Sequence, residues 1–328
     1  MLSRVADSIY WMSRYVERAD NIARVVDVNL NLMLDSSDGS AQQWDPLIYT
    51  MGDHERFKAR FGEATTQDNV THFLTFDEEN PNSILSCLRS ARENARSIRE
   101  IISSEMWLHL NKFYLLVNSA ASAGRGLESP HQFFSDIKAS SFLFTGVTDA
   151  TLTHGESWHF AKLGQELERA DKTSRILDVK YFILLPSVND VGSAFDDVQW
   201  AAVLRSCSAF EMYRKKHGKI TPSSIVDFLL LNAQFPRSIR YCSNAAQASL
   251  HAISGTPLGN FRTPPEKLLG QLCSDLAYDN VEEVLQNGLH EYLDELQTTM
   301  NKVGAGVHHI FFSRRLPTPK TVSKERVQ

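Results

Sequence analysis

The chain has 328 residues, of which 42% are hydrophobic and 22% charged, a composition typical of a globular protein of about two domains. Lysine and arginine total 34 against 39 acidic residues, and the net charge of −5 argues against nonspecific nucleic-acid binding, which needs a basic surface. Apolar runs such as Phe228 to Leu231 are too short for a membrane span, and the first residues hold no apolar signal core, so a cytoplasmic protein is expected.

Helical patterns dominate the first half of the chain. Over 4–34 apolar residues recur at helical spacing, and turn-forming residues over 35–40 end that helix. Residues 42–78 predict two short helices with loops. A long helical stretch follows over about 80–123, with a candidate break at 103–104.

The second half continues in the same way. The pattern predicts helices over 130–145 and about 155–185, a linker over 187–194, a capped helix start at Thr221-Pro222, and a loop rich in glycine and proline over 255–265. No convincing strand pattern occurs, so the fold is predicted to be all-α. Residues 313–328 carry five basic residues, one acid and two prolines, and are expected to form a disordered basic tail.

One charged motif occurs twice, 151 residues apart. The copies share seven residues at identical spacing: Glu17, Arg18, Ala19, Asp20, Arg24, Asp27 and Val28, then Glu168, Arg169, Ala170, Asp171, Arg175, Asp178 and Val179. The sequence Arg-Ser-Ile-Arg also recurs, at 96–99 and 237–240. Two matches in the same order predict two duplicated helical units, 1–150 and 151–312, packed as one domain with approximate pseudo-twofold symmetry.

The repeated charges share one face of a helix. At 100° per residue, the four positions from Glu17 to Asp27 fall within an arc of about 80°. Three interpretations are open: a solvated face whose i,i+4 pairs contribute about 0.2–0.5 kcal/mol each, a buried lattice of bidentate arginine–carboxylate pairs between the copies, or a ligand site. A solvated face would accept lysine for arginine, so the identity of the copies favours the other two.

The Arg-Ser-Ile-Arg copies supply four further arginines: Arg96, Arg99, Arg237 and Arg240. Arginines three residues apart share a helix face, which suits phosphate or carboxylate recognition. It suits equally well an ion pairing with the acidic stripe of the motif helices, and we favour that pairing.

Catalytic and metal-binding patterns are weak. Glu156 and His159 have the spacing of a di-iron helix ligand pair, but that architecture needs two such pairs. Walker, dinucleotide-binding and zinc-protease motifs do not occur. The four cysteines are far apart and are expected to be reduced core thiols. No metal or cofactor is therefore predicted, and the catalytic residues, if any, stay unknown.

At these motifs the chain resembles the bacterial alpha-E domain family. The resemblance rests on Leu2-Ser3-Arg4 leading to Tyr10-Trp11, on 14–19, Ala23-Arg24 and Asp27-Val28, on 91–96, on Trp158, Leu163-Gly164 and 167–171, and on 173–179 and 235–238. It extends to about residue 312. One departure is Gln165, where the family pattern has arginine, so the second copy lacks a counterpart of Arg14.

The resemblance implies an all-helical protein without an established activity of its own. Members are typically encoded beside, or fused to, circularly permuted ATP-grasp proteins and transglutaminase-like peptidases. One hypothesis is thus an auxiliary partner of an ATP-grasp-linked peptide or amide ligase. The alternative is an enzyme subunit that binds an anionic or peptide substrate in a cleft lined by the Glu/Asp/Arg stripes, with carboxylates as general bases. The direction in which the stripes face should separate the two.

Overall fold

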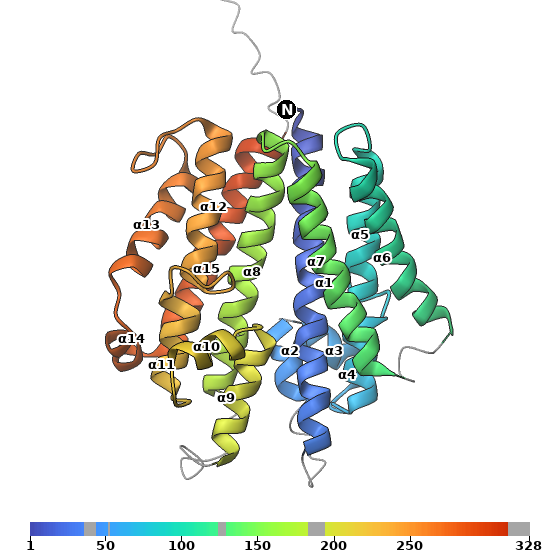
Figure 1. The fold of residues 1–328 in the computed structure, drawn as a ribbon, viewed down its shortest axis with the longest axis vertical. Helices are drawn as coiled ribbons and strands as arrows, with labels where there is room; N and C mark the ends of the chain where they lie inside the picture. Colours follow the sequence, from blue (N-terminus) through green and yellow to red (C-terminus); the bar gives the residue numbers. More distant parts are fainter. Residues whose placement is uncertain (36–43, 52, 124–128, 183–193, 314–328) are drawn as a thin grey trace, which may run out of the picture.

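The computed structural model describes residues 1–35, 44–51, 53–123, 129–182 and 194–313. Every regular element within these ranges is a helix, which confirms the all-α prediction (Figure 1). The basic tail lies, apart from Ser313, outside the described residues, as does most of the linker predicted over 187–194. Among the described helices, none combines the length and the apolar composition needed to cross a bilayer.

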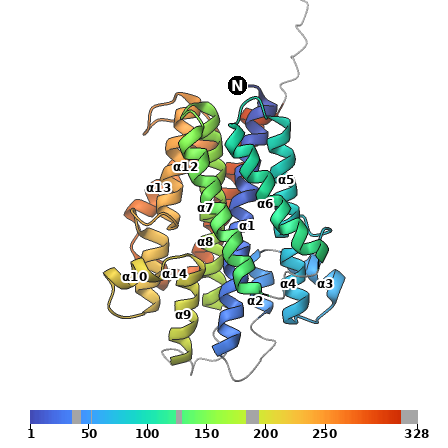
Figure 2. The same cartoon turned by 45° about the vertical axis from the view of Figure 1, so that its right-hand side comes forward.

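Two long helices, α1 (Ser3–Asp35) and α8 (Glu156–Phe182), lie side by side at the centre of the bundle (Figures 1 and 2). Other helices surround α1, so its charged stripe from Glu17 to Asp27 is buried. Among its apolar residues Ile22 and Val26 are buried, and Trp11 and Tyr15 are partly buried. Gly164 sets the separation of the central pair, because a Cβ at this position would lie 2.4 Å from the Tyr10 carbonyl oxygen.

The first half of the chain flanks α1. Three helices, α5 (Ile84–Ser97), α6 (Ser104–Ala123) and α7 (Pro130–Thr151), form this side of the bundle (Figure 1). Three short helices, rather than the predicted two, lie near the C-terminal end of α1: α2 (Asp45–Met51), α3 (His54–Phe61) and α4 (Gln67–Thr75). The third one arises because Gly62, at a φ of +63°, ends α3 before Thr66 caps α4.

The second half of the chain flanks α8. Its long helices are α12 (Ile239–Ser254), α13 (Pro264–Tyr278) and α15 (Leu289–Val307). Shorter elements complete this side: α9 (Ala194–Ser206), α10 (Phe210–Lys216), α11 (Pro222–Val226), η4 (Asp227–Leu231), α14 (Val281–Asn287) and η5 (His308–Phe312). The predicted helix start at Thr221-Pro222 is confirmed, with the Thr221 hydroxyl accepting from the Ser224 amide at 3.3 Å.

The matching sequences at 96–99 and 237–240 do not occupy equivalent positions in the fold. Arg96 lies in the last turn of α5, whereas Arg237 precedes Ser238, the N-cap of α12. The residue that caps α5 in the same way is Ser83. A four-residue match is short enough to occur by chance in a helical sequence. The duplication of the two halves stays a prediction, which a superposition of 1–150 on 151–312 would check.

Candidate functional site: a buried ion-pair cluster between the central helices

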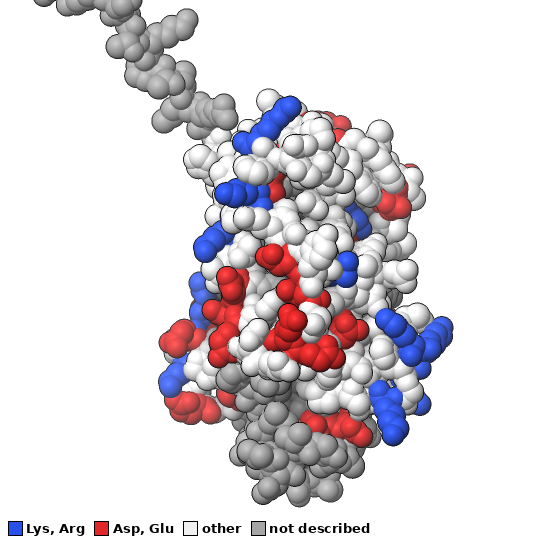
Figure 3. All heavy atoms as spheres, turned by 90° about the vertical axis from the view of Figure 1, so that its left-hand side faces the viewer, with Lys and Arg blue, Asp and Glu red and all other residues white. Residues whose placement is uncertain are grey.

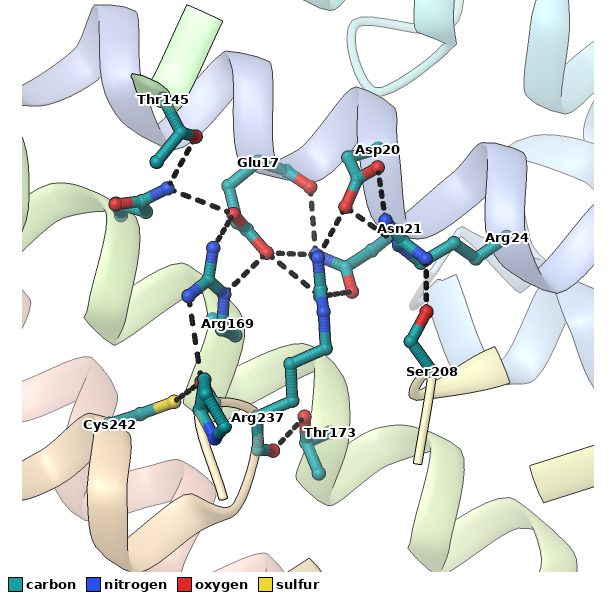
Figure 4. Close-up of polar contacts among 12 residues, drawn as sticks. Glu17, Asp20, Asn21, Arg24, Thr145, Arg169, Thr173, Ser208, Arg237 and Cys242 are labelled. Atoms are coloured by element: carbon teal, nitrogen blue, oxygen red, sulfur yellow. Dashed lines mark hydrogen bonds and ion pairs between the residues drawn. The ribbon is translucent and has the colours of Figure 1, made fainter. Parts of the chain in front are cut away.

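Two glutamates form the centre of the charged cluster: Glu17 on α1 is 2% exposed and Glu168 on α8 is 0% exposed. Each is held by an arginine of the opposite helix. Arg169 donates from Nε to Glu17 Oε1 at 2.9 Å and from Nη2 to Oε2 at 2.7 Å (Figure 4). Arg18 donates likewise to both oxygens of Glu168, at 2.7 and 3.1 Å. The arginine of each Glu-Arg motif therefore binds the glutamate of the other motif. Bidentate geometry explains why lysine does not replace arginine.

Further arginines close the surroundings of Glu17 (Figure 4). Arg237 donates to Glu17 Oε1 at 3.0 Å and to Asp20 Oδ2 at 2.5 Å. Arg24 binds both oxygens of Asp20, at 2.8 and 3.0 Å, and also contacts the Ser208 hydroxyl. Asn21 accepts from Arg237 at 3.1 Å and donates to Glu17. Every charge in this half therefore has a partner supplied by the protein.

Different residues compensate the charge of Glu168. Arg14 donates from Nε to Glu168 Oε2 at 2.8 Å. Lys172 lies 3.9 Å from Glu168 and 3.4 Å from Asp171, and Arg175 lies 3.0 Å from Asp171. Arg18 also donates to Asn82 Oδ1 at 2.6 Å, and Asn82 in turn donates to Asp53. Both Arg24 and Arg175 thus pair with carboxylates of the motif, as predicted.

At two corresponding positions, the two halves of the cluster differ in which one carries a cation and which one carries an amide. Asn21 and Lys172 stand 151 residues apart, and Asn82 and Arg237 each follow a proline and precede the serine that caps α5 or α12. Asn21 occurs with Arg237, and Lys172 occurs with Asn82. Each glutamate therefore has one cation from these two positions: Arg237 beside Glu17 and Lys172 beside Glu168. The motif match missed Asn21, Lys172 and Asn82, although the shared pattern Pro-x-Ser before both helices would have located Asn82.

The outer ends of the motif tie the central helices to their flanks. Asp27 lies 3.0 Å from His131 Nδ1 and 2.6 Å from Lys138 Nζ, both on α7. Asp178 lies 2.7 Å from His290 Nδ1 on α15. Charged contacts of this kind fix the position of α7 and α15 along the central pair.

Three of the predicted arginines lie outside the cluster. Arg96 is exposed and pairs with Glu93 at 2.6 Å, and the Arg99 guanidinium lies over the Trp107 ring at 4.9 Å. Arg240 donates to the Leu231 carbonyl at 3.3 Å. The expected pairing of the Arg-Ser-Ile-Arg residues with the acidic stripe is made by Arg237 alone, which lies in the loop before α12 and binds Glu17 and Asp20.

The electrostatics keep the glutamates ionised. Burial by itself would raise the pKa of Glu17, but the charges of Arg169 and Arg237 lower it well below its usual value. Arg18 and Arg14 outweigh burial in the same way and lower the pKa of Glu168. A general base working near neutral pH needs a raised pKa and an open approach. These carboxylates have neither property.

Other chemistry has little support nearby. Burial raises the pKa of Cys87 and of Cys207 to about 12, so their thiols are poor nucleophiles at neutral pH. Glu156 of the Glu-x-x-His pair binds the Met1 amino group at 2.8 Å. Within the described part of the chain, no group of three or more His, Cys, Asp or Glu residues has the geometry to hold a metal ion.

A cavity of about 290 Å³ opens beside the cluster, between α1, α7 and α8. Apolar walls come from Val16, Phe144 and Ala161, and Trp158 and Lys162 also line it. Its connection with the cluster is Gln165, whose Nε2 lies 3.0 Å from Thr145 Oγ1 and 3.5 Å from Glu17 Oε2.

These features define an all-helical bundle whose central helices are joined by reciprocal glutamate–arginine pairs. The chain belongs to the Alpha-E family, described as a predicted alpha-helical domain with a conserved ER motif, whose profile matches residues 1–312. Curated relatives from Mycobacterium bovis and Mycobacterium tuberculosis, described as uncharacterised proteins, are 24% and 23% identical over 326 residues. The match covers 93% of this chain and 35% of each relative, so the chain spans about a third of their length. No solved structure matches the chain.

Proposed function

We propose that the chain is a helical partner of a circularly permuted ATP-grasp protein in a peptide- or amide-ligating system, with no reaction of its own. The observation that carries the proposal is the mutual contact of the two charged stripes. Glu17, Asp20 and Glu168 are at most 2% exposed, and their oxygens are bound by arginines of the chain itself. Residues that are fully used in such contacts hold the bundle together rather than bind a substrate.

The proposed partners are those that the family resemblance implies. The resembling proteins are encoded beside, or fused to, ATP-grasp proteins and transglutaminase-like peptidases, and a ligase partner would supply the nucleotide site. The curated relatives carry further sequence beyond the region matched here, since that region is 35% of their length. A helical region that is joined to further sequence in its relatives suits a role as a docking component.

An acidic face offers a surface for such docking (Figure 3). It lies over α13, α14 and α15 and is formed by Asp275, Asp279, Glu282, Glu283, Glu291, Asp294 and Glu295. Tyr278, 89% exposed, lies at the end of α13 within this face. Exposed tyrosines are frequent anchors of protein interfaces, and a single-sign surface speeds association with a partner of opposite charge. The partner surface should therefore be basic.

The test is co-purification with the ATP-grasp protein encoded nearby, followed by ATP-dependent ligation assays with and without this chain. Reversing charge on the acidic face, with Glu291→Lys and Asp294→Lys together, should weaken the complex at least tenfold, and added salt should weaken it further. Glu55→Lys with Asp68→Lys, two exposed acids on α3 and α4, is the matched control and should leave binding unchanged. Ligation at full rate without this chain would contradict the proposal.

The cavity at Gln165 favours a second candidate, an enzyme subunit that takes an anionic or peptide substrate beside the Glu/Asp/Arg cluster. Its test is ATP turnover by the purified chain alone. Turnover that is abolished by Glu17→Gln or Glu168→Gln, with the fold intact, would establish this alternative in place of the auxiliary role.

A further inference from the structure

The cavity beside Gln165 occupies a place that large side chains fill on the other side of the cluster. There, Arg14 donates to Glu168 Oε2 at 2.8 Å and to the Tyr10 hydroxyl at 3.1 Å. Its guanidinium lies over the rings of Tyr10 and Trp11, at 5.5 and 5.0 Å. This side therefore holds a cation stacked on aromatic rings next to a buried glutamate.

Smaller side chains occupy the positions 151 residues later. Ala161 stands for Tyr10, Lys162 for Trp11 and Gln165 for Arg14. Gln165 reaches toward Glu17 Oε2 as Arg14 reaches toward Glu168, but it places a neutral amide at 3.5 Å instead of a guanidinium at 2.8 Å. The exchange leaves the cavity of about 290 Å³. On the opposite wall, a Cβ added to Gly146 would meet nothing within 4 Å.

We propose that this cavity binds a small organic cation that carries a flat apolar group, such as an amidinium or guanidinium beside a ring. The ligand supplies what Tyr10 and Arg14 supply on the other side. Asp149 at the cavity wall provides a carboxylate for the cation. The partly buried Trp158 ring is stacked on His154 at 4.3 Å and provides its other face. The inference is independent of the ATP-grasp partnership.

Charge and size agree with this ligand class. The lysine of the cavity, Lys162, is already paired with buried Glu166 at 2.7 Å, and Arg169 is paired with Glu17. Their charges are therefore compensated by the protein. The Asp149 side chain is 64% exposed, and its carboxylate lies 3.5 Å from Nε2 of His154, a ring that carries a charge only when it is protonated. A cavity of roughly 150 Å³ accepts benzene, so the volume here admits a ring together with a cationic group.

Benzamidine and benzamide are suitable probes, because they have the same shape and only benzamidine is charged. Isothermal titration of the full chain should give a Kd for benzamidine at least tenfold lower than that for benzamide. Equal affinity for the two would reduce the site to a nonpolar cavity and overturn the proposal, as would the absence of benzamidine binding at millimolar concentration.

Variants place the binding in the cavity. Gln165→Arg should fill it from α8 and abolish benzamidine binding, and Gly146→Leu should fill it from α7 without touching the ion pairs. Asp149→Asn should weaken binding at least threefold, while Asp136→Asn, elsewhere on α7, should not change it. Melting followed by circular dichroism shows whether each variant is folded, so Gly146→Leu decides the matter if Gln165→Arg does not fold. Unchanged affinity in a folded, filled variant would overturn the proposal.

Discussion

At the scale of single residues, the cluster shows how buried charges become tolerable in a helical bundle. Glu17 and Glu168 each receive two parallel hydrogen bonds from an arginine of the facing helix. Desolvation of a buried ion pair is costly, and geometry of this quality offsets most of the cost. The larger consequence is specificity, because removal of either partner leaves a buried charge without compensation.

Arg237→Ala should therefore be strongly destabilising. Arg237 is 6% exposed and binds both Glu17 and Asp20. Removing one partner of a buried pair costs about 3–5 kcal/mol in the free energy of unfolding. The matched control is Arg96→Ala, whose exposed pair with Glu93 should contribute about 0–1 kcal/mol. Urea denaturation measures both, and equal midpoints for the two variants would contradict the buried-lattice interpretation.

Because the cation and the amide occupy opposite positions in the two halves, swapping them in one half should restore stability that each single change removes. Asn21→Lys together with Arg237→Asn recreates around Glu17 the arrangement of Lys172 and Asn82. Each single change should destabilise the fold, since one adds a buried cation and the other removes one. The double variant should recover roughly 0.5–3 kcal/mol relative to the sum of the singles. Combining Asn21→Lys with Arg96→Asn, which is remote and exposed, should instead give additive losses in denaturation experiments.

The depressed pKa values of Glu17 and Glu168 predict acid sensitivity. A carboxyl whose pKa is lower in the folded than in the unfolded state contributes stability that is fully present above the unfolded value, near 4.5. The contribution is lost as the pH falls from there through the folded pKa. The free energy of unfolding should thus fall below about pH 4.5. Glu168→Gln should show a shallower dependence in urea titrations at a series of pH values, and an unchanged slope would count against this origin.

At the scale of the helices, a close contact between α1 and α8 places the ion pairs within reach. Gly164→Ala would bring a Cβ to 2.4 Å from the Tyr10 carbonyl, so the central helices must separate. Overpacking of this kind costs about 1–3 kcal/mol. Gly146→Ala is the matched control, since its Cβ meets nothing within 4 Å and helix propensity should stabilise it by about 0.5–1 kcal/mol. Thermal melting distinguishes the opposite signs, and equal shifts would refute the contact argument.

At the scale of the whole molecule, the two halves depend on one another. The arginines that neutralise Glu17 include Arg169 and Arg237, and those that neutralise Glu168 are Arg14 and Arg18. Each half alone would expose the charged and apolar faces of its central helix. The halves are therefore predicted to form one cooperative unit, whatever their origin.

A split between α7 and α8 checks this dependence. Residues 1–153 and 154–313, produced separately, should lack cooperative unfolding, and mixing them should restore a complex with native helicity. Circular dichroism and size-exclusion chromatography measure the two properties. Cooperative unfolding of either fragment by itself would show that the halves are independent domains.

The sequence by itself determined the fold class and the helices that carry the charges. Periodicity over 4–34 and 155–185, and the cap at Thr221, depend on residues within a few positions of each other, so they can be predicted without tertiary structure. The identity of the two motif copies also indicated bidentate arginine contacts, because that geometry excludes lysine.

Only the tertiary structure decided which residues complete the site. Arg96 and Arg99 share the sequence of Arg237 and Arg240, yet Arg96 ends a helix and Arg237 precedes one. The cation–amide exchange between the halves and the cavity at Gln165 both depend on which helix faces which across more than a hundred residues. Such contacts follow from the packing of whole helices rather than from local spacing. A short motif such as Pro-x-Ser can locate a residue like Asn82, but it does not show which helix that residue contacts.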